Sequence, residues 1–211
     1  MTEKKTMICA FDGLEKHVDQ RYSEWIDFIV ESQPYVNWAK DLAKHLHDGD
    51  KYGDEPYIYH LYGVARKTLE LAPFLLEHAD GDYQTLLTQA LMVAFMHDSV
   101  EDGKITISDL RIHFGDMLSE FSSTLSIDVD AVIQAISNLT RRDDETYPQY
   151  ILNKICNNGC HITKLVKIAD LRFNKEHNLI AMRKGKKHFK HMYDKYSFAE
   201  FIVMQSVYTK I

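Results

Sequence analysis

The sequence predicts an all-α fold. Apolar residues recur at helical spacing along nearly the whole chain, whereas the apolar–polar alternation of a half-buried strand is scarce. Only 4 prolines and 9 glycines interrupt the 211 residues, so few helices are broken internally. Hydrophobic residues make up 45% of the chain and charged residues 27%, a composition typical of a globular protein with one sizeable core. We therefore expect a helical bundle.

The apolar periodicity predicts the helices in chain order, with bounds accurate to about two to four residues. They cover residues 14–31, 35–47, 58–72, 83–101, 107–114, 129–139, 147–156, 160–177 and 192–209. Asp82, Ser108 and Asp128 are suitable N-caps, because their short side chains accept hydrogen bonds from free amides of the first helical turn. Residues 1–34 are expected to form an N-terminal helical extension on a main domain of residues 35–211.

Several features exclude other classes of protein. The N-terminus does not resemble a signal peptide, and no run approaches the ~18 uncharged apolar residues of a membrane span. The three cysteines do not form a disulfide framework. The formal net charge is 25 − 31 = −6, which argues against a nucleic-acid partner. We expect a cytoplasmic protein without a membrane partner; the sequence does not determine the oligomeric state.

Positive charge is concentrated only at residues 183–191, interpreted as a solvated loop or helix end. An acidic protein that handles an anionic substrate needs a local cation, and a metal ion is the simplest candidate.

The segment from Leu86 to Asp102 gives the strongest indication of a site. Five apolar residues fall on one arc of the predicted helix: Leu86, Leu87, Ala90, Leu91 and Ala94. His97, Asp98, Glu101 and Asp102 follow on that arc. Unpaired buried carboxylates are costly, and a divalent metal ion would neutralise them. The alternative is a helix that ends near residue 102, with its acidic residues in solvent.

Two other segments carry single candidates. Asp170 and Asn174 lie one turn apart at the edge of an apolar stripe. The stripe consists of Ile162, Leu165, Val166, Ala169 and Phe173. Asp170 is therefore a candidate ligand, and an ion pair with Lys167 or Arg172 explains it equally well. His60 shares a helical face with Leu61, Val64, Ala65 and Thr68. A single histidine on such a face is more often an ordinary core residue.

Together, His60, His97-Asp98 and Asp170 stand in the order H…HD…D. This order resembles that of the metal-binding residues in the HD phosphohydrolases. Four stretches are similar to the hydrolase domains of the RelA/SpoT type, within residues 38–178. They are residues 56–65 (PYIYHLYGVA), residues 94–102 (AFMHDSVED), Phe114-Gly115 with Leu139-Thr140, and residues 164–174 (KLVKIADLRFN). Four ordered motifs are far more specific than an HD pair alone. The resemblance implies an HD-domain helical bundle.

The resemblance also implies a metal site and an activity. One divalent ion, usually Mn²⁺, would be held by His60, His97, Asp98 and Asp170. Glu101 and Asp102 would orient and deprotonate the attacking water, since metal binding lowers the pKa of water. Lys51 and Asn174 match residues that contact the nucleotide in the family. Lys167, close in sequence to a predicted ligand, is a further candidate for binding phosphate.

The chain departs from the family pattern at three places, all of which concern the substrate more than the metal. Gly103 replaces the threonine after the Glu-Asp pair, and Leu171 separates Asp170 from Arg172. The loop at residues 48–54 is more acidic than the family's basic loop. Its Asp48, Asp50 and Asp54 would repel a highly charged nucleotide if they faced the same cleft.

Two remaining patterns have simpler explanations. Cys156, Cys160 and His161 could suggest zinc, but no second pair of ligands accompanies them, so ordinary cysteines are favoured. Tyr147 and Tyr150 could stack on a base, but two aromatic residues on one helix are more often part of the core.

The leading hypothesis is a single-domain, manganese-dependent (p)ppGpp 3′-pyrophosphohydrolase acting on a small-molecule nucleotide. A second hypothesis keeps the site but changes the substrate, for example to the 2′-phosphate of NADPH, and the acidic loop favours it. A third is a nucleotide-binding sensor with a degenerate active site. The presence of all six expected ligands and catalytic carboxylates argues against this third hypothesis.

Overall fold

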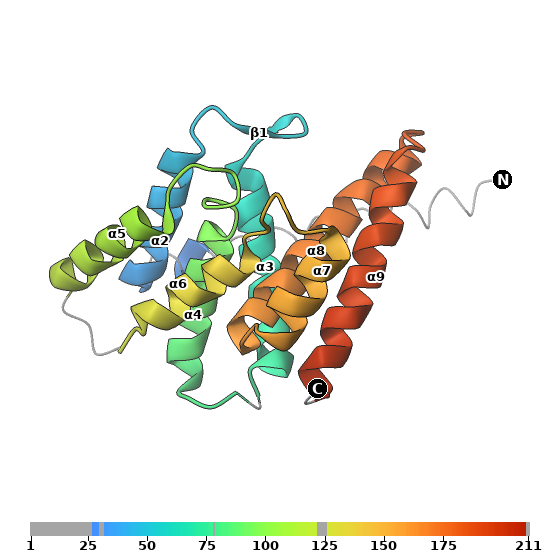
Figure 1. The fold of residues 1–211 in the computed structure, drawn as a ribbon. Helices are drawn as coiled ribbons and strands as arrows, with labels where there is room; N and C mark the ends of the chain where they lie inside the picture. Colours follow the sequence, from blue (N-terminus) through green and yellow to red (C-terminus); the bar gives the residue numbers. More distant parts are fainter. Residues whose placement is uncertain (1–26, 30–31, 78, 122–125, 210–211) are drawn as a thin grey trace, which may run out of the picture.

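The computed structural model describes residues 27–29, 32–77, 79–121 and 126–209. These residues form the all-α bundle that the sequence predicts, with one short two-stranded hairpin (Figure 1). The elements are α2 (Pro34–Leu46), β1 (Lys51–Tyr52), β2 (Glu55–Pro56), α3 (Ile58–Leu75), α4 (Tyr83–Met96), α5 (Ile107–Glu120), α6 (Val129–Leu139), α7 (Tyr147–Tyr150), η1 (Ile151–Asn157), α8 (His161–Arg183) and α9 (Phe189–Tyr208). The helix expected at 14–31 lies mostly outside the described residues. The domain boundary at residue 34 stays a prediction.

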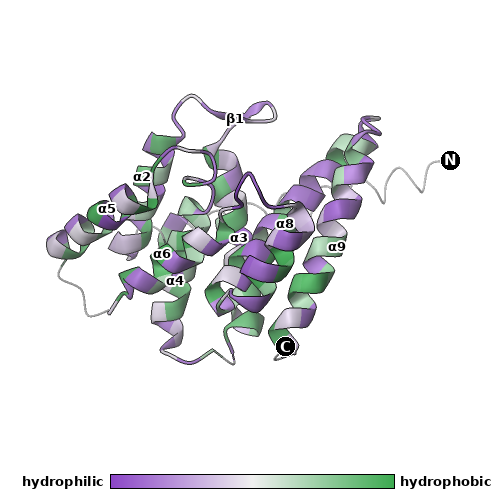
Figure 2. Ribbon diagram, viewed as in Figure 1, coloured by the Kyte–Doolittle hydropathy of each residue, from purple (hydrophilic) through white to green (hydrophobic). Residues whose placement is uncertain are grey.

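Helix α4 is the centre of the bundle. It packs against α2, α3, α6 and α8, and every residue from Leu87 to His97 is buried. The sequence predicted one buried arc, whereas neighbouring helices cover α4 on all sides. Figure 2 shows the hydrophobic residues of α3, α4 and α6 gathered in the middle of the bundle, with hydrophilic residues along the β1 loop. The protein therefore buries the α4 end that leads into His97.

Two of the three predicted N-caps are confirmed. The Asp82 carboxylate accepts a hydrogen bond from the Thr85 amide at 2.8 Å, and Asp128 accepts one from the Ala131 amide at 3.0 Å. The cap predicted at Ser108 is wrong. The N-cap is Thr106, whose hydroxyl accepts the Asp109 amide at 3.1 Å, and α5 begins at residue 107 as predicted.

The predicted helix 83–101 ends earlier, at Met96. Residues 97–103 continue as turns, in which the Ser99 amide bonds back to the Met96 carbonyl at 3.1 Å. Gly103 then adopts φ +66°, a left-handed conformation that glycine takes without strain. The turn reverses the chain, so the Lys104 amide reaches the Ser99 carbonyl at 2.9 Å. The residues after Met96 therefore form turns rather than a continuous helix, although His97 keeps helical dihedrals and the Asp102 amide donates to the Asp98 carbonyl at 2.8 Å.

Other helices also differ from their predicted bounds. Helices α5 and α8 run six residues further, to Glu120 and Arg183. The helix expected at 147–156 is one turn of α-helix followed by the π-helix η1. Among the described helices, none combines the length and apolar composition needed to span a bilayer.

Helix α8 connects the centre of the bundle with its edge. On one side Gly63 of α3 lies against the Phe173 ring, so closely that a β-carbon at Gly63 would be 1.9 Å from a ring atom. On the other side, Glu200 of α9 accepts hydrogen bonds from Arg172 at 2.7 Å and Lys175 at 2.6 Å. Arg172, which the family places directly after the aspartate, thus binds α9 in this protein.

Candidate metal centre and substrate cavity

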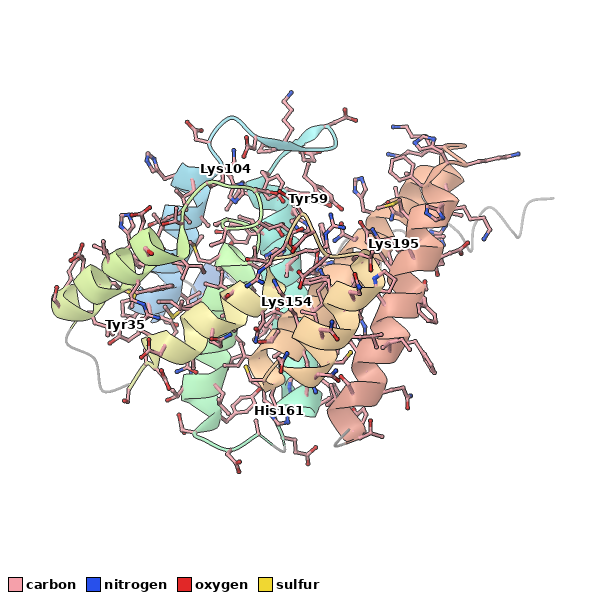
Figure 3. All side chains as sticks on the ribbon, viewed as in Figure 1. Tyr35, Tyr59, Lys104, Lys154, His161 and Lys195 are labelled. Carbon is pink, nitrogen blue, oxygen red and sulfur yellow. The ribbon has the colours of Figure 1, made fainter. Side chains whose placement is uncertain are left out.

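The candidate site lies at the end of the bundle that carries the β1–β2 hairpin. Tyr59 and Lys195 mark this end in Figure 3, and His161 lies at the opposite end. Three elements converge here: the first turn of α3 supplies His60, the turn after α4 supplies His97, and the middle of α8 supplies Asp170.

His60, His97 and Asp170 form a buried group that could hold a metal ion. They offer ligand atoms within 4.8 Å of one another. The His60 Nε2 and His97 Nε2 atoms lie 3.6 Å and 3.9 Å from Asp170 Oδ1. At 2%, 3% and 7% exposure, these polar groups have little water to solvate them, so a cation would compensate their burial.

Asp98 joins this group from the turn after α4. Its Oδ2 atom lies 3.2 Å from His60 Nε2 and 3.0 Å from His97 Nε2. The Tyr57 hydroxyl donates a hydrogen bond of 2.7 Å to the same oxygen. All four predicted metal ligands therefore lie together, although they come from three segments far apart in sequence.

The orientation of His97 fits a metal ligand. Its Nδ1 lies 2.8 Å from the Ala94 carbonyl, which places the proton on Nδ1 and directs the Nε2 lone pair toward the carboxylates. That buried Nε2 has no hydrogen-bond partner among the described residues, despite its proximity to Asp98. A carbonyl behind the ring and an unpartnered nitrogen in front are the usual surroundings of a metal-bound histidine.

The charges of the cluster also favour a cation. Burial of His97 opposes its protonation, but the carboxylates of Asp98 and Asp170 outweigh this and raise the pKa of His97 to about 9. Burial likewise opposes ionisation of Asp98, yet the two histidines hold its pKa well below its usual range. The site thus stabilises positive charge between its carboxylates, whether a proton or a metal ion supplies it.

Glu101 and Asp102 follow the ligands in the turn, but they face different surroundings. Glu101 lines the cavity beside the metal ligands, and its Oε2 accepts a hydrogen bond from the Arg141 amide at 3.1 Å. Asp102 does not line this cavity. The surrounding protein excludes water and raises the pKa of both carboxyl groups, and Asp98 adds to the effect on Asp102. The expectation that both lie on one helical arc is wrong, because α4 ends at Met96.

The cavity beside the metal ligands has a volume of about 220 Å³ and a polar lining. Three cationic side chains face it: Arg141, Lys167 and Lys195. The Lys167 Nζ lies 2.9 Å from Asp170 Oδ2, and the Lys195 Nζ lies 3.9 Å from the Tyr147 ring centroid. Burial, followed by Arg141 and Lys167, lowers the pKa of Lys195. The cavity can therefore bind an anion next to the ligand cluster.

Of the predicted substrate residues, Lys167 and Asn174 line the cavity, whereas Lys51 is exposed in β1 and does not. Asn174 accepts a hydrogen bond from the Tyr52 hydroxyl at 2.7 Å, and its Nδ2 donates to both the backbone carbonyl and the carboxylate of Asp170. Its amide thus orients Asp170, a predicted metal ligand. Tyr52, the neighbour of Lys51, stacks on the His60 ring with centroids 4.6 Å apart.

Sequence reasoning did not assign a role to several residues of the cavity wall. They are Tyr52, Tyr57, Arg141, Lys195 and Tyr196. Tyr57 stands inside the motif around His60, and Arg141 directly follows the Leu-Thr motif, so proximity to those motifs was an available signal. Lys195 and Tyr196 lie on α9, where no motif marks them.

The acidic loop does not line the cavity. Asp50 pairs with Lys104 at 2.6 Å and with His47 at 3.2 Å, whereas Asp48 and Asp54 are exposed. The expected repulsion of a charged nucleotide therefore has no support in this geometry, which weakens the argument for a less anionic substrate.

The cysteine–histidine pattern lies away from the cavity, whereas the tyrosine pair lines it. Cys156 is buried and Cys160 is exposed, with its Sγ 3.4 Å from Thr163 Oγ1. They do not join His161 in a group of potential ligands within the part of the chain that the structure describes. Tyr150 is buried and donates to the Leu139 carbonyl at 2.6 Å, as expected of a core residue. Both Tyr147 and Tyr150 also line the cavity.

A helical bundle with a buried His–His–Asp group beside a cationic cavity has the features that metal-assisted hydrolysis of a phosphate ester requires. Comparison with curated proteins agrees. Over 143 residues, the chain is 31% identical to guanosine-3′,5′-bis(diphosphate) 3′-pyrophosphohydrolase MESH1 of Xenopus tropicalis and 29% identical to that of Homo sapiens. Each match covers 64% of this chain and 65% of the relative.

A bacterial relative extends the comparison. The chain is 32% identical over 117 residues to the guanosine-3′,5′-bis(diphosphate) 3′-pyrophosphohydrolase of Vibrio cholerae. This match covers 55% of the chain and 14% of the bacterial protein. The chain thus spans slightly less than two thirds of the MESH1 relatives. No protein-family model matches it. Its homologues are nevertheless named (p)ppGpp 3′-pyrophosphohydrolases, which confirms the resemblance seen in the sequence motifs.

Proposed function

We propose that this protein is a metal-dependent phosphohydrolase that hydrolyses (p)ppGpp at the 3′ position, releasing pyrophosphate and GDP or GTP. The observation that carries the proposal is the buried cluster of His60, His97 and Asp170 directly beside a cavity with three cationic side chains. The names of the homologues support the choice of substrate.

His60, His97, Asp98 and Asp170 would hold one divalent ion. Two imidazole nitrogens and two carboxylates, without a thiolate, suit Mn²⁺ among the available metals. When bound, such an ion lowers the pKa of water and polarises a phosphoryl oxygen. Asn174 keeps Asp170 in place through its amide, and Tyr57 does the same for Asp98 through its hydroxyl.

Glu101 is the residue best placed to accept a proton from the attacking water. Its carboxylate lines the cavity and is held by the Arg141 amide. Burial raises the pKa of Glu101, which makes its carboxylate a stronger base than that of an ordinary glutamate. Asp102, further from the cavity, would support this role through the electrostatics of the turn.

The phosphate groups of the substrate would be bound by Lys167, Lys195 and Arg141. Cationic donors of this kind make short, charge-assisted hydrogen bonds to phosphate oxygens. A substrate with a 5′-diphosphate and a 3′-diphosphate has more charge than one metal ion can neutralise, so several cations around the metal suit it. Lys51 would reach the nucleotide only at the outer edge, from the hairpin.

The deciding experiment compares kcat/KM for ppGpp, NADPH and simple nucleotides with Mn²⁺, with the products separated by ion-exchange chromatography. We expect GDP and pyrophosphate from ppGpp, at a clearly higher efficiency than any product from NADPH. Turnover of NADPH with ppGpp untouched would reject the (p)ppGpp assignment and leave the metal chemistry in place. Absence of turnover with every nucleotide would favour a sensor.

A further inference from the structure

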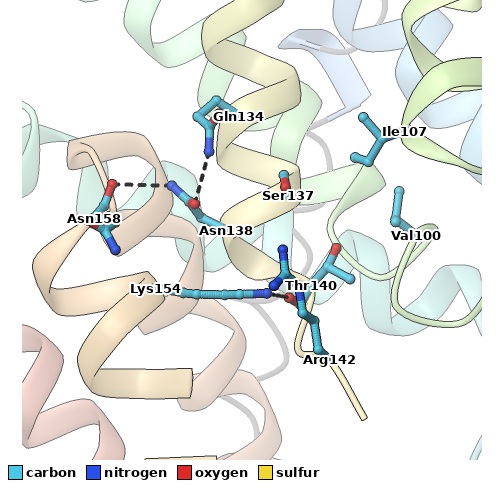
Figure 4. Close-up of a pocket in the computed structure, with 9 residues that line it drawn as sticks. All are labelled: Val100, Ile107, Gln134, Ser137, Asn138, Thr140, Arg142, Lys154 and Asn158. Carbon is cyan, nitrogen blue, oxygen red and sulfur yellow. Dashed lines mark hydrogen bonds between the residues drawn. The ribbon is translucent and has the colours of Figure 1, made fainter. Parts of the chain in front are cut away.

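A second cavity, larger than the catalytic one, lies on the other side of the turn after α4. Its volume is about 590 Å³, within the range of roughly 300–1,000 Å³ typical of small-molecule sites. Figure 4 shows it between α6, which carries Gln134, Ser137 and Asn138, and the segment with Val100 and Ile107. Nothing in the proposed mechanism uses this cavity.

Polar contacts hold the wall of the second cavity in place. Asn138, only 8% exposed, accepts a hydrogen bond from the Gln134 amide at 3.1 Å and donates to the Asn158 carbonyl at 3.3 Å. Lys154 extends across the wall and donates to the Thr140 carbonyl at 2.7 Å (Figure 4). It also pairs with Glu145 at 3.2 Å. These contacts order the polar groups before any ligand arrives.

Several groups on this wall are available to a ligand. Within the described residues, no hydrogen bond or ion pair engages the Arg142 guanidinium, and Glu145, the nearby carboxylate, already pairs with Lys154. The side-chain oxygens of Gln134 and Asn158 likewise accept no hydrogen bond within the described residues. No carboxylate lines the cavity. A guanidinium binds phosphate oxygens in pairs, and amide oxygens accept N–H groups of a base.

The two cavities share a wall. Val100 faces the second cavity and the next residue, Glu101, faces the catalytic one. Likewise, Arg142 faces the second cavity and Arg141 faces the catalytic one. The Arg141 backbone amide donates the hydrogen bond that holds Glu101. A ligand bound to Arg142 would therefore act on the backbone segment that positions the proposed base.

We propose that the second cavity binds a nucleoside monophosphate as an effector, with its phosphate at Arg142 and its base between the amides of α6 and the apolar side chains of Val100 and Ile107. Binding to this cavity does not depend on which substrate the catalytic cavity hydrolyses. The change in catalytic rate, transmitted through Arg141 to Glu101, rests on the proposed function.

Amide NMR of the full chain loaded with Mg²⁺, a diamagnetic ion that does not broaden nearby amide signals as Mn²⁺ does, tests binding during titration with GMP. We expect saturable shifts at residues 134–142 and 154–158. Arg142→Ala should raise the Kd about tenfold or more, the scale of losing a charged hydrogen bond, and Arg183→Ala, an exposed arginine elsewhere, should leave it unchanged. Ser137→Trp, which fills the cavity, should abolish these shifts and serves as a second variant if Arg142→Ala misfolds.

The site is rejected if GMP causes no saturable shift, if the shifts are confined to residues of the catalytic cavity, or if Arg142→Ala binds GMP as well as the wild type does. The effector role is tested with the kcat for ppGpp, which should change with GMP in the wild type and in Arg183→Ala but not in Arg142→Ala. A kcat insensitive to GMP rejects the effector role. If the protein binds GMP through Arg142 but does not hydrolyse ppGpp, the GMP site is supported and only the proposed function is contradicted.

Discussion

Glu101 and Asp102 differ in their surroundings, and the difference predicts different roles. Glu101 lines the catalytic cavity and accepts a hydrogen bond from the Arg141 backbone amide, whereas Asp102 does not line the cavity. Glu101→Gln should lower kcat roughly 100-fold or more, the usual scale for losing a general base, while the protein keeps its metal. Asp102→Asn should lower kcat by a smaller factor. Steady-state kinetics and metal analysis of both variants measure this, and wild-type rates in Glu101→Gln would disprove the assignment.

The ligand histidines make a second prediction at the scale of single residues. His97→Ala removes a nitrogen whose orientation the Ala94 carbonyl fixes, so the variant should lose stoichiometric Mn²⁺. His161→Ala, a control at the opposite end of the bundle (Figure 3), should retain it. Metal analysis after purification distinguishes the two. Unchanged metal content after replacing both His60 and His97 would show that the cluster is not the metal centre.

At the scale of elements, the contact between α3 and α8 holds two ligands in register. Gly63 lies one turn after His60, and the Phe173 ring packs within 5.4 Å of the His60 ring, measured between centroids. A β-carbon at Gly63 would overlap that ring, which itself is 6% exposed and confined. The contact therefore couples helix packing to the geometry of the metal site.

Gly63→Ala should destabilise the protein by about 1–3 kcal/mol, the usual cost of overpacking a core, and should weaken Mn²⁺ binding because Phe173 is pushed toward His60. Gly115→Ala in α5 is the matched control: nothing lies within 4 Å of its added β-carbon, so it should stabilise the helix by roughly 0.5–1 kcal/mol. Urea unfolding and metal titration measure both effects. A Gly63→Ala protein as stable as the wild type would contradict the packing argument.

The elements also show what the sequence could predict. That the four predicted ligands lie together could be expected from the sequence, because each stands within a motif on, or directly after, a strongly periodic helix. The end of α4 at Met96 could not be predicted, because turn hydrogen bonds and Gly103 determine it while His97, Asp98, Glu101 and Asp102 keep the helical spacing of the arc. Lys195 carried no signal because no motif marks α9, which packs against α8 and η1. The role of Lys51 stays a prediction, since the hairpin brings its neighbour Tyr52 to the cavity while Lys51 does not line it.

At the scale of the whole molecule, the metal should act as part of the core. The predicted ligands come from α3, the turn after α4, and α8, so one ion would connect three segments that also pack against one another. Without a cation, the carboxylates and imidazoles of this cluster are buried at a cost that the fold must offset elsewhere. Binding to the folded state alone then adds stability by mass action, about 2.7 kcal/mol when the free ion is at 100 times its Kd.

Mn²⁺ should therefore raise the midpoint of thermal unfolding, and EDTA should lower it. For a domain of this size, 2.7 kcal/mol corresponds to a shift of roughly 5–10 °C, at about 2–4 °C per kcal/mol. The shift should grow with the logarithm of the Mn²⁺ concentration in the wild type and in Glu101→Gln, which keeps all four ligands. In His97→Ala it should be strongly reduced. Calorimetry with and without EDTA measures these shifts. An equal Mn²⁺ effect on His97→Ala and the wild type would mean that the ion stabilises the protein from a site other than the cluster of His60, His97, Asp98 and Asp170.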